Sequence, residues 1–144
     1  VAFRSRADTL VPSDTNGKDD VFVHDRQTGE MNIISKGSDG KPANGPSSLP
    51  SISGDGRYVA FESEASNLVR GDANGKADAF VHDRQTGSTE MVSVNAASLQ
   101  GNSGGCIVPS INGDGRYVAF ESESSNLVTG DKNDKTDVFI HDLR

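Results

Sequence analysis

Short runs of alternating apolar and polar residues follow one another along this chain, separated by turns rich in glycine, asparagine and aspartate. Three such runs occupy residues 57–63, 78–83 and 88–94, and Val, Ile, Phe, Tyr and Thr dominate them. Branched and aromatic side chains at alternate positions suit the pleated, half-buried surface of a strand. Stretches with Ala, Leu, Glu and Lys at helical spacing are missing. The pattern therefore predicts an all-β fold.

The pattern also repeats, at an interval of about 58 or 59 residues. The run Val-Ala-Phe-Glu-Ser at 59–63 recurs at 118–122, and a weaker copy, Val-Ala-Phe-Arg-Ser, occupies 1–5. The run Asp-Ala-Phe-Val-His-Asp at 78–83 has counterparts at 20–25 and 137–142. The segment with Pro-Ser-Ile and Gly-Asp-Gly-Arg-Tyr over 50–58 recurs over 109–117. Self-similarity at a fixed period of this size predicts a repeat architecture.

Each repeat contains four strand signals, at 50–53, 57–63, 78–83 and 88–94 in the middle copy, which we call strands A to D. Four short antiparallel strands in a unit of this length are typical of a β-propeller blade. The chain then holds strands B, C and D of one blade, a whole second blade, and strands A, B and C of a third, over 1–35, 48–95 and 108–144. We expect the core to contain Ile52, Val59, Phe61, Val81 and their counterparts.

The repeated motifs carry a resemblance. The run Pro-Ser-Ile-Ser-x-Asp-Gly-Arg-Tyr-Val-Ala-Phe, followed by Asp-x-Phe-Val-x-Asp-x-x-Thr-Gly, resembles the TolB-type β-propeller repeat of bacteria. The variant with Ser-Asn-Leu-Val-x-Gly-Asp-x-Asn-Gly between strands B and C is similar to repeats of bacterial exported proteins, mostly without known activity. The resemblance implies a propeller, usually of six blades, and a periplasmic or secreted location. It implies no particular chemistry, because a fold does not fix a function.

A six-bladed ring needs about 350 residues at this period. We therefore expect the 144 residues to form about two and a half blades of a larger ring, as a single propeller fragment over 1–144. Missing sequence or another chain would supply the rest.

The connections between strands divide into two classes that antiparallel connectivity places on opposite faces. The A–B and C–D turns are short, whereas the B–C loops (64–77 and 123–136) and the D–A loops (36–49 and 95–108) are long. Loops of about 12–15 residues without structure of their own are usually functional or disordered. We therefore expect function on the face that carries the B–C and D–A loops, which we call the long-loop face.

Every B–C loop contains the same polar set, Asp-x-Asn-x-x-x-Asp, and in two copies a glycine follows the asparagine. Calcium takes about six to eight oxygen ligands from carboxylates, amides, backbone carbonyls and water. The loops are shorter than an EF-hand and lack its final glutamate, and they resemble more closely the calcium loops of integrin-type propeller blades. A plain turn is the competing interpretation, because Asp and Asn bond their own backbone. The predicted Ca²⁺ ligands are Asp14, Asn16, Asp20, Asp72, Asn74, Asp78, Asp131, Asn133 and Asp137.

Three other constellations are attributed to structure instead of chemistry. The run Gly101-Asn102-Ser103-Gly104-Gly105 matches a nucleophile elbow, but that elbow needs a strand before the serine and a helix after it. The repeated histidines occupy equivalent strand positions in different blades, too far apart to share one metal, and the glutamates around strand B form a solvated stripe. These residues are His24, His82, His141, Glu62, Glu64, Glu121 and Glu123.

Composition narrows the possible partners. No run approaches the roughly 18 apolar residues of a membrane span. The net charge of −7 and the isoelectric point near 4.8 argue against nucleic acid, which is bound through basic patches. The single cysteine, Cys106, excludes an internal disulfide and leaves a free thiol or a bridge to another chain.

The sequence favours a non-enzymatic, calcium-stabilised propeller module of an exported bacterial protein, which presents the long-loop face to a protein or glycan. One alternative is an accessory propeller domain of a larger hydrolase whose catalytic residues lie outside this chain. Another is a structural repeat of a surface layer or filament, in which unpaired strand edges join between copies.

Overall fold

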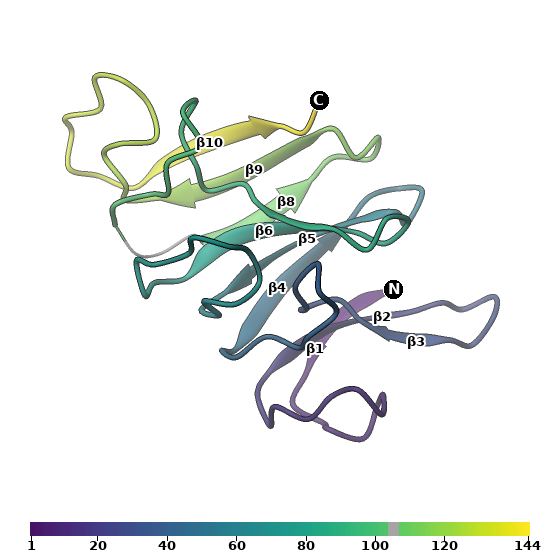
Figure 1. The fold of residues 1–144 in the computed structure, drawn as a ribbon. Coiled ribbons are helices and arrows are strands. Elements are labelled where there is room, and N and C mark those ends of the chain that lie inside the picture. Colours follow the sequence, from purple (N-terminus) through teal and green to yellow (C-terminus); the bar gives the residue numbers. More distant parts are fainter. Residues whose placement is uncertain (104–106) are drawn as a thin grey trace.

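The computed structural model describes residues 1–103 and 107–144, and within them ten strands form three antiparallel sheets (Figure 1). The first sheet comprises β1 (Ala2–Ser5), β2 (Asp20–His24) and β3 (Met31–Ile33). The second comprises β4 (Ser47–Ile52), β5 (Tyr58–Ser63), β6 (Asp78–Asp83) and β7 (Thr89–Met91). The third comprises β8 (Ile107–Ile111), β9 (Tyr117–Ser122) and β10 (Asp137–Asp142).

This arrangement confirms the prediction of propeller blades. In each sheet the strands follow their order in the chain and pair antiparallel, so the three sheets contain B-C-D, A-B-C-D and A-B-C. The described residues contain no helix that is long and apolar enough to cross a membrane.

Strand A begins earlier than predicted and contains a bulge. β4 starts at Ser47 instead of residue 50, and its pairing with β5 shifts register between Ser48 and Ser51. Leu49 and its counterpart Val108 adopt positive φ angles of 52° and 56°. A bulge inserts an extra residue and bends the strand, so β4 continues on both sides of the proline at position 50.

The core lies between successive sheets. Phe61 and Phe80 stack with ring centroids 5.8 Å apart and pack against Val21 and Val23 of the preceding sheet. The next interface repeats this arrangement, with a second stacked phenylalanine pair packed on Ala79 and Val81 of the middle sheet; the pair is Phe120 and Phe139. Burying such aromatic and branched side chains is the main term that stabilises a fold of this kind.

Most of the predicted core is confirmed, and the exceptions lie in the two outer sheets, where Val1, the counterpart of Val59, is 62% exposed. Val59, Phe61 and Val81 are buried, and Ile52 is partly buried against the same cluster. Ile140, the counterpart of Val81, is 72% exposed, and its neighbour Val138 is 69% exposed. Both lie on the face of the third sheet that corresponds to the covered face of the second, and in this structure no further sheet packs on it.

The short turns also join the blades. The Gly54 N–H donates to the carbonyl of Gly113 across 2.9 Å, which links the A–B turns of the second and third sheets. A Cβ atom on residue 54 would lie 2.9 Å from that same oxygen. Glycine at position 54 therefore permits the close approach of two blades.

Candidate functional site: the acidic loops

The long loops form one hydrogen-bonded layer on their face of the sheets (Figure 1). Between the first two sheets, the Asn67 amide donates to the Pro42 carbonyl at 2.9 Å, and its oxygen accepts the Asn44 N–H at 2.9 Å. Asn126 makes the same pair of contacts one repeat later, with the Gln100 carbonyl and the Asn102 N–H, both at 2.9 Å. Each D–A loop is thus fixed to the B–C loop that follows it, and these loops are ordered by their own side chains.

The second B–C loop brings two of its predicted carboxylates to a single amide nitrogen. Nε2 of Gln100 donates to Asp72 at 2.7 Å and to Asp78 at 2.9 Å. The Ser93 hydroxyl donates to the other oxygen of Asp78 at 2.7 Å. Burial raises the pKa of Asp78, and the hydrogen bonds from Ser93, Asn74 and Gln100 oppose that shift.

The asparagine of this loop takes a different position. The Asn74 side-chain oxygen accepts the Lys76 N–H at 2.8 Å, which forms an Asx turn, and its amide nitrogen donates to Asp78 at 3.0 Å. The nitrogen, not the oxygen, therefore faces the carboxylate. Gln100 and Ser93 belong to this site although both lie outside the Asp-x-Asn-x-x-x-Asp motif that predicts it.

The first loop has the same carboxylates and lacks the bridging amide. Asp20 is fully buried and Asp14 is 6% exposed. The Ser35 hydroxyl donates to one oxygen of Asp20 at 2.6 Å, as Ser93 does to Asp78. Oδ1 of Asp14 and Oδ2 of Asp20 are buried and have no hydrogen-bond partner.

The electrostatics of the first loop reflect this difference. Burial raises the pKa of Asp20, and the charges of Asp14 and Asp19 add to the shift, while the Ser35 hydrogen bond and the nearby Asn16 amide oppose it. The Asn16 amide is close to Asp20 but lacks hydrogen-bond geometry with it, so Oδ2 of Asp20 keeps no partner. Asn16 makes the same Asx turn as its counterpart, accepting the N–H two residues ahead at 2.7 Å. Its amide nitrogen donates to the backbone carbonyl of Ala43 at 2.9 Å.

The third loop is the most exposed of the three. Asn133 donates to Asp137 at 2.8 Å and accepts the Lys135 N–H at 2.8 Å, so the Asx turn is shared by all three repeats and the asparagine–aspartate hydrogen bond by the second and third. Asp131 and Asp137 are partly exposed. Asp134 stands where the other loops have glycine and adopts a φ of 52°. In place of a following strand D and D–A loop, this loop faces solvent in the structure.

No group of three or more His, Cys, Asp or Glu side chains is placed to hold a metal among residues 1–103 and 107–144. Each loop accordingly offers two carboxylates, together with backbone carbonyls, and the nine-residue calcium set stays a prediction. Residues 104–106, which include Cys106 and the last two glycines of the Gly-x-Ser-x-Gly run, lie outside the described residues.

The middle histidine belongs to the packing between blades. Nδ1 of His82 lies 2.9 Å from the Thr89 hydroxyl, which donates to the Lys36 carbonyl of the preceding D–A loop at 2.6 Å. The imidazole is 2% exposed, and burial lowers its pKa to about 4. It is therefore neutral at physiological pH and links a strand to the loop of the neighbouring blade.

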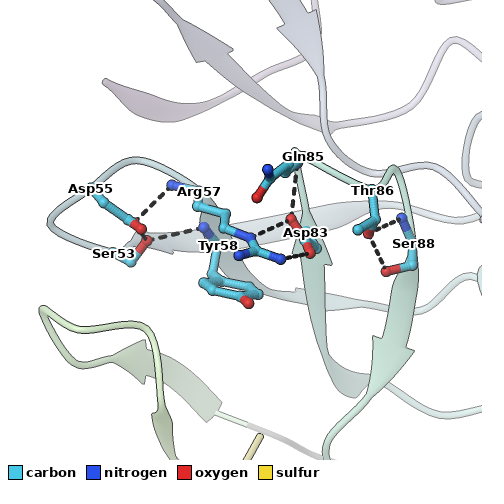
Figure 2. Close-up of polar contacts among 8 residues, drawn as sticks. All are labelled: Ser53, Asp55, Arg57, Tyr58, Asp83, Gln85, Thr86 and Ser88. Atoms are coloured by element: carbon cyan, nitrogen blue, oxygen red, sulfur yellow. Dashed lines mark hydrogen bonds and ion pairs between the residues drawn. The ribbon is translucent and has the colours of Figure 1, made fainter.

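The opposite face carries a repeated ion pair (Figure 2). The Arg57 guanidinium forms a bidentate ion pair with Asp83, with N···O distances of 3.0 and 2.7 Å. Its central carbon lies over the Tyr58 ring, 4.7 Å from the ring centroid. The bonds from Arg57 hold the pKa of Asp83 well below its usual range. Arg116 and Asp142 repeat the fork at 3.0 and 2.8 Å. The Gly-Asp-Gly-Arg-Tyr motif thus supports the blade and does not form part of the acidic loops.

Comparison with known proteins supports the architecture. The β-propeller domain of the Trilobed protease from Pyrococcus furiosus is similar over 87% of this chain and 31% of its own length, at 18% identity and a TM-score of 0.53. TolB from Acinetobacter baumannii is similar over 88% of this chain, at 21% identity and a TM-score of 0.51. The chain has the fold of a TolB-type β-propeller.

A putative TolB from Agrobacterium tumefaciens is similar over 90% of this chain, at 19% identity and a TM-score of 0.54. The chain spans 24% of the Acinetobacter protein and 39% of the Agrobacterium protein. No family model matches the sequence, and no curated protein matches it.

Proposed function

We propose that this chain is a non-enzymatic propeller module of an exported bacterial protein and that its long-loop face binds a protein or glycan. The observation that carries the proposal is the layer of hydrogen-bonded B–C and D–A loops on that face. Binding surfaces are commonly built from loops that a rigid scaffold positions, and the stacked sheets provide such a scaffold. The short-turn face, by contrast, carries the repeated arginine–aspartate forks that brace each blade.

The polar groups of the long-loop face support a binding role over catalysis. The hydroxyls of Ser35 and Ser93 donate to buried carboxylates, and Gln100 and the loop asparagines are occupied by their neighbours. A nucleophile needs a base within hydrogen-bond reach and a site for the reacting atom. A serine whose proton is directed at a fixed carboxylate inside a blade lacks that site.

Export and calcium belong to the same proposal. The loop motifs resemble those of exported bacterial proteins, and extracellular calcium modules work at about 10⁻⁴–10⁻³ M affinity. Calcium-binding loops of that affinity suit a periplasmic or secreted protein better than a cytosolic one. The first loop, with two unpaired buried carboxylate oxygens, is the strongest candidate among the three.

A second candidate is an accessory propeller domain of a larger hydrolase. The similarity to the propeller domain of the Trilobed protease favours it, because that propeller is one domain of a protease. In that case the long-loop face would contact a catalytic domain of the same polypeptide instead of a separate partner.

Site-directed photo-cross-linking tests the proposal. A cross-linker at Arg70, exposed on the second B–C loop, is compared with one at Gln85, exposed on a C–D turn, in the cell envelope of the bacterium that encodes the protein. We expect adducts from position 70 and few from position 85. Adducts from neither position, or equal adducts from both, would contradict the proposed face. Adducts from position 70 to a hydrolase domain of the same polypeptide would favour the second candidate.

A further inference from the structure

The first two acidic loops share one motif, and one of several sequence differences between the D–A loops that follow them places Gln100 against the carboxylates of the second loop alone. Pro42 stands at the equivalent position of the first repeat. Pro42 and Gln100 form isolated bridges to Lys36 and Val94 respectively, and the carbonyl oxygen of each accepts an asparagine amide N–H from the next B–C loop. The serine bound to the buried aspartate is also shared, as Ser35 and Ser93. The second repeat therefore has a side-chain amide between its two carboxylates, and the first repeat has proline at the equivalent position.

The Gln100 amide supplies positive charge density between two carboxylates. It donates to both Asp72 and Asp78, so one group satisfies an oxygen on each. Asp72 keeps one buried oxygen without a partner. Proline offers no side-chain donor at the equivalent place. In the first loop, consequently, both carboxylates keep a buried, unpaired oxygen, on Asp14 and Asp20.

Two buried carboxylates that each keep an unpaired oxygen repel each other and have lost hydration, which is unfavourable unless a counter-charge is present. Both side chains are more than nine-tenths buried. The charge of Asp14 adds to the raised pKa of Asp20, and the equivalent carboxylates of the second loop converge on one nitrogen atom. The Ser35 hydroxyl donates to Oδ1 of Asp20 at 2.6 Å and leaves Oδ2 without a partner.

We propose that the first loop binds a divalent, oxygen-seeking cation, calcium, between Asp14 and Asp20, at the place that the Gln100 amide occupies in the second loop. The inference rests on the calcium part of the proposed function and narrows it to one loop. Two carboxylates balance the charge of the dication, and backbone carbonyls and water complete its shell. Asp20 opens β2, so the ion ties the long 6–19 loop to the first sheet.

A shared proton is the competing way to satisfy the pair. The charged groups that act on Asp20 are Asp14 and Asp19, and both favour protonation. A proton and a calcium ion compete for the same oxygens, so the two cases separate at neutral pH. A protonated pair gains stability on acidification and is indifferent to calcium, whereas a calcium site gains stability from the ion.

Calorimetric titration of the protein with calcium chloride tests the inference. We expect about one site per chain with a dissociation constant of about 0.1–1 mM, the range of extracellular modules. Asp14→Asn, which removes one charge at nearly constant shape, and Pro42→Gln, which introduces the amide of the second loop, should each weaken binding at least about tenfold. Asp72→Asn is the matched control and should leave this site unchanged. Gln100→Ala, conversely, should add a second site.

Three results would overturn the inference: no heat of binding up to about 10 mM calcium, unchanged binding in Asp14→Asn, or an equal loss in Asp72→Asn. Melting curves in chelator show that each variant is folded, and Asp14→Asn should melt there no lower than the wild type, because it relieves repulsion. The titration involves no partner. If calcium does not bind but cross-linking remains specific to position 70, the calcium site is rejected and the proposed binding face is kept. If calcium binds but cross-linking is not specific to position 70, the binding face alone is rejected.

Discussion

The phenylalanine at the centre of strand B offers a test of blade packing, because the position occurs three times and only two of the copies face a preceding sheet. Phe61 is fully buried, stacks on Phe80 at 5.8 Å and packs against Val21 and Val23 of the preceding sheet. Phe3 stacks in the same way, at 5.9 Å, but it is partly exposed and no preceding sheet covers it. The difference between the two positions is therefore the contact with a neighbouring blade.

Replacing Phe61 by alanine removes its buried area and leaves a cavity between two blades, at a cost of about 3–5 kcal/mol. Phe3→Ala loses part of that area and leaves no closed cavity, so about 1–2 kcal/mol is expected. Phe120, 3% exposed and stacked on Phe139 at 5.8 Å, should behave like Phe61.

Urea unfolding followed by circular dichroism measures these costs, with equal m-values as the sign that only stability has changed. The free energy of unfolding of a single domain is typically about 5–15 kcal/mol, so Phe61→Ala removes a large share of it. If Phe61→Ala does not fold, Phe61→Leu and Phe3→Leu give the same comparison at smaller cost. Equal destabilisation at positions 3 and 61 would refute the packing of successive sheets described here.

Three further predictions concern single groups. Burial lowers the pKa of His82 to about 4 from an ordinary value of 6.5. The stabilising contribution of the neutral ring is therefore complete above pH 6.5 and is lost as the pH falls toward 4. An NMR titration of the ring with a midpoint near 6.5 would contradict this. Gly54→Ala should lower the melting temperature, because the new Cβ would lie 2.9 Å from the Gly113 carbonyl oxygen. Gly113→Ala is the control and should melt higher than Gly54→Ala, because its Cβ would have no neighbour within 4 Å. Equal melting temperatures of the two variants would refute the contact. Arg57 holds the pKa of Asp83 below its usual range, so the ion pair stabilises the folded protein at neutral pH and less in acid. Asp83→Asn should therefore melt at a lower temperature than the wild type at about pH 7, and the difference in melting temperature should narrow toward about pH 3. A difference that stays constant with pH would argue against the ion pair.

The blade architecture is readable from the sequence because strand periodicity and repetition agree. Three copies of the same alternating runs specify which residues face the neighbouring sheet, and β6 begins and ends where the pattern predicts. The start of strand A is different: Leu49 takes a positive φ without being glycine, and Pro50 is typical of a strand start. Such a bulge is imposed by the pairing with β5, so local sequence does not reveal it.

The acidic loops were partly predictable for a similar reason. The spacing of Asp72 and Asp78 correctly placed two carboxylates together, since both contact one nitrogen. The direction of the Asn74 amide depends on whether its oxygen bonds the backbone or a ligand, and both uses have the same spacing. Gln100 lies 22 residues beyond Asp78 and has no glutamine counterpart in the first repeat. Aligning the repeats shows proline at that place, and the mismatch is the one sequence signal for its role.

A crystal structure of the protein grown with about 10 mM calcium tests the central claim most directly, namely that an ion organises the first long loop while an amide organises the second. The claim predicts a strong density peak about 2.3–2.6 Å from oxygens of both Asp14 and Asp20. It also predicts that the Gln100 amide remains bound to Asp72 and Asp78 with no ion beside it. A first loop whose carboxylates contact only water or each other, or an ion that displaces Gln100 in the second loop, would contradict the claim.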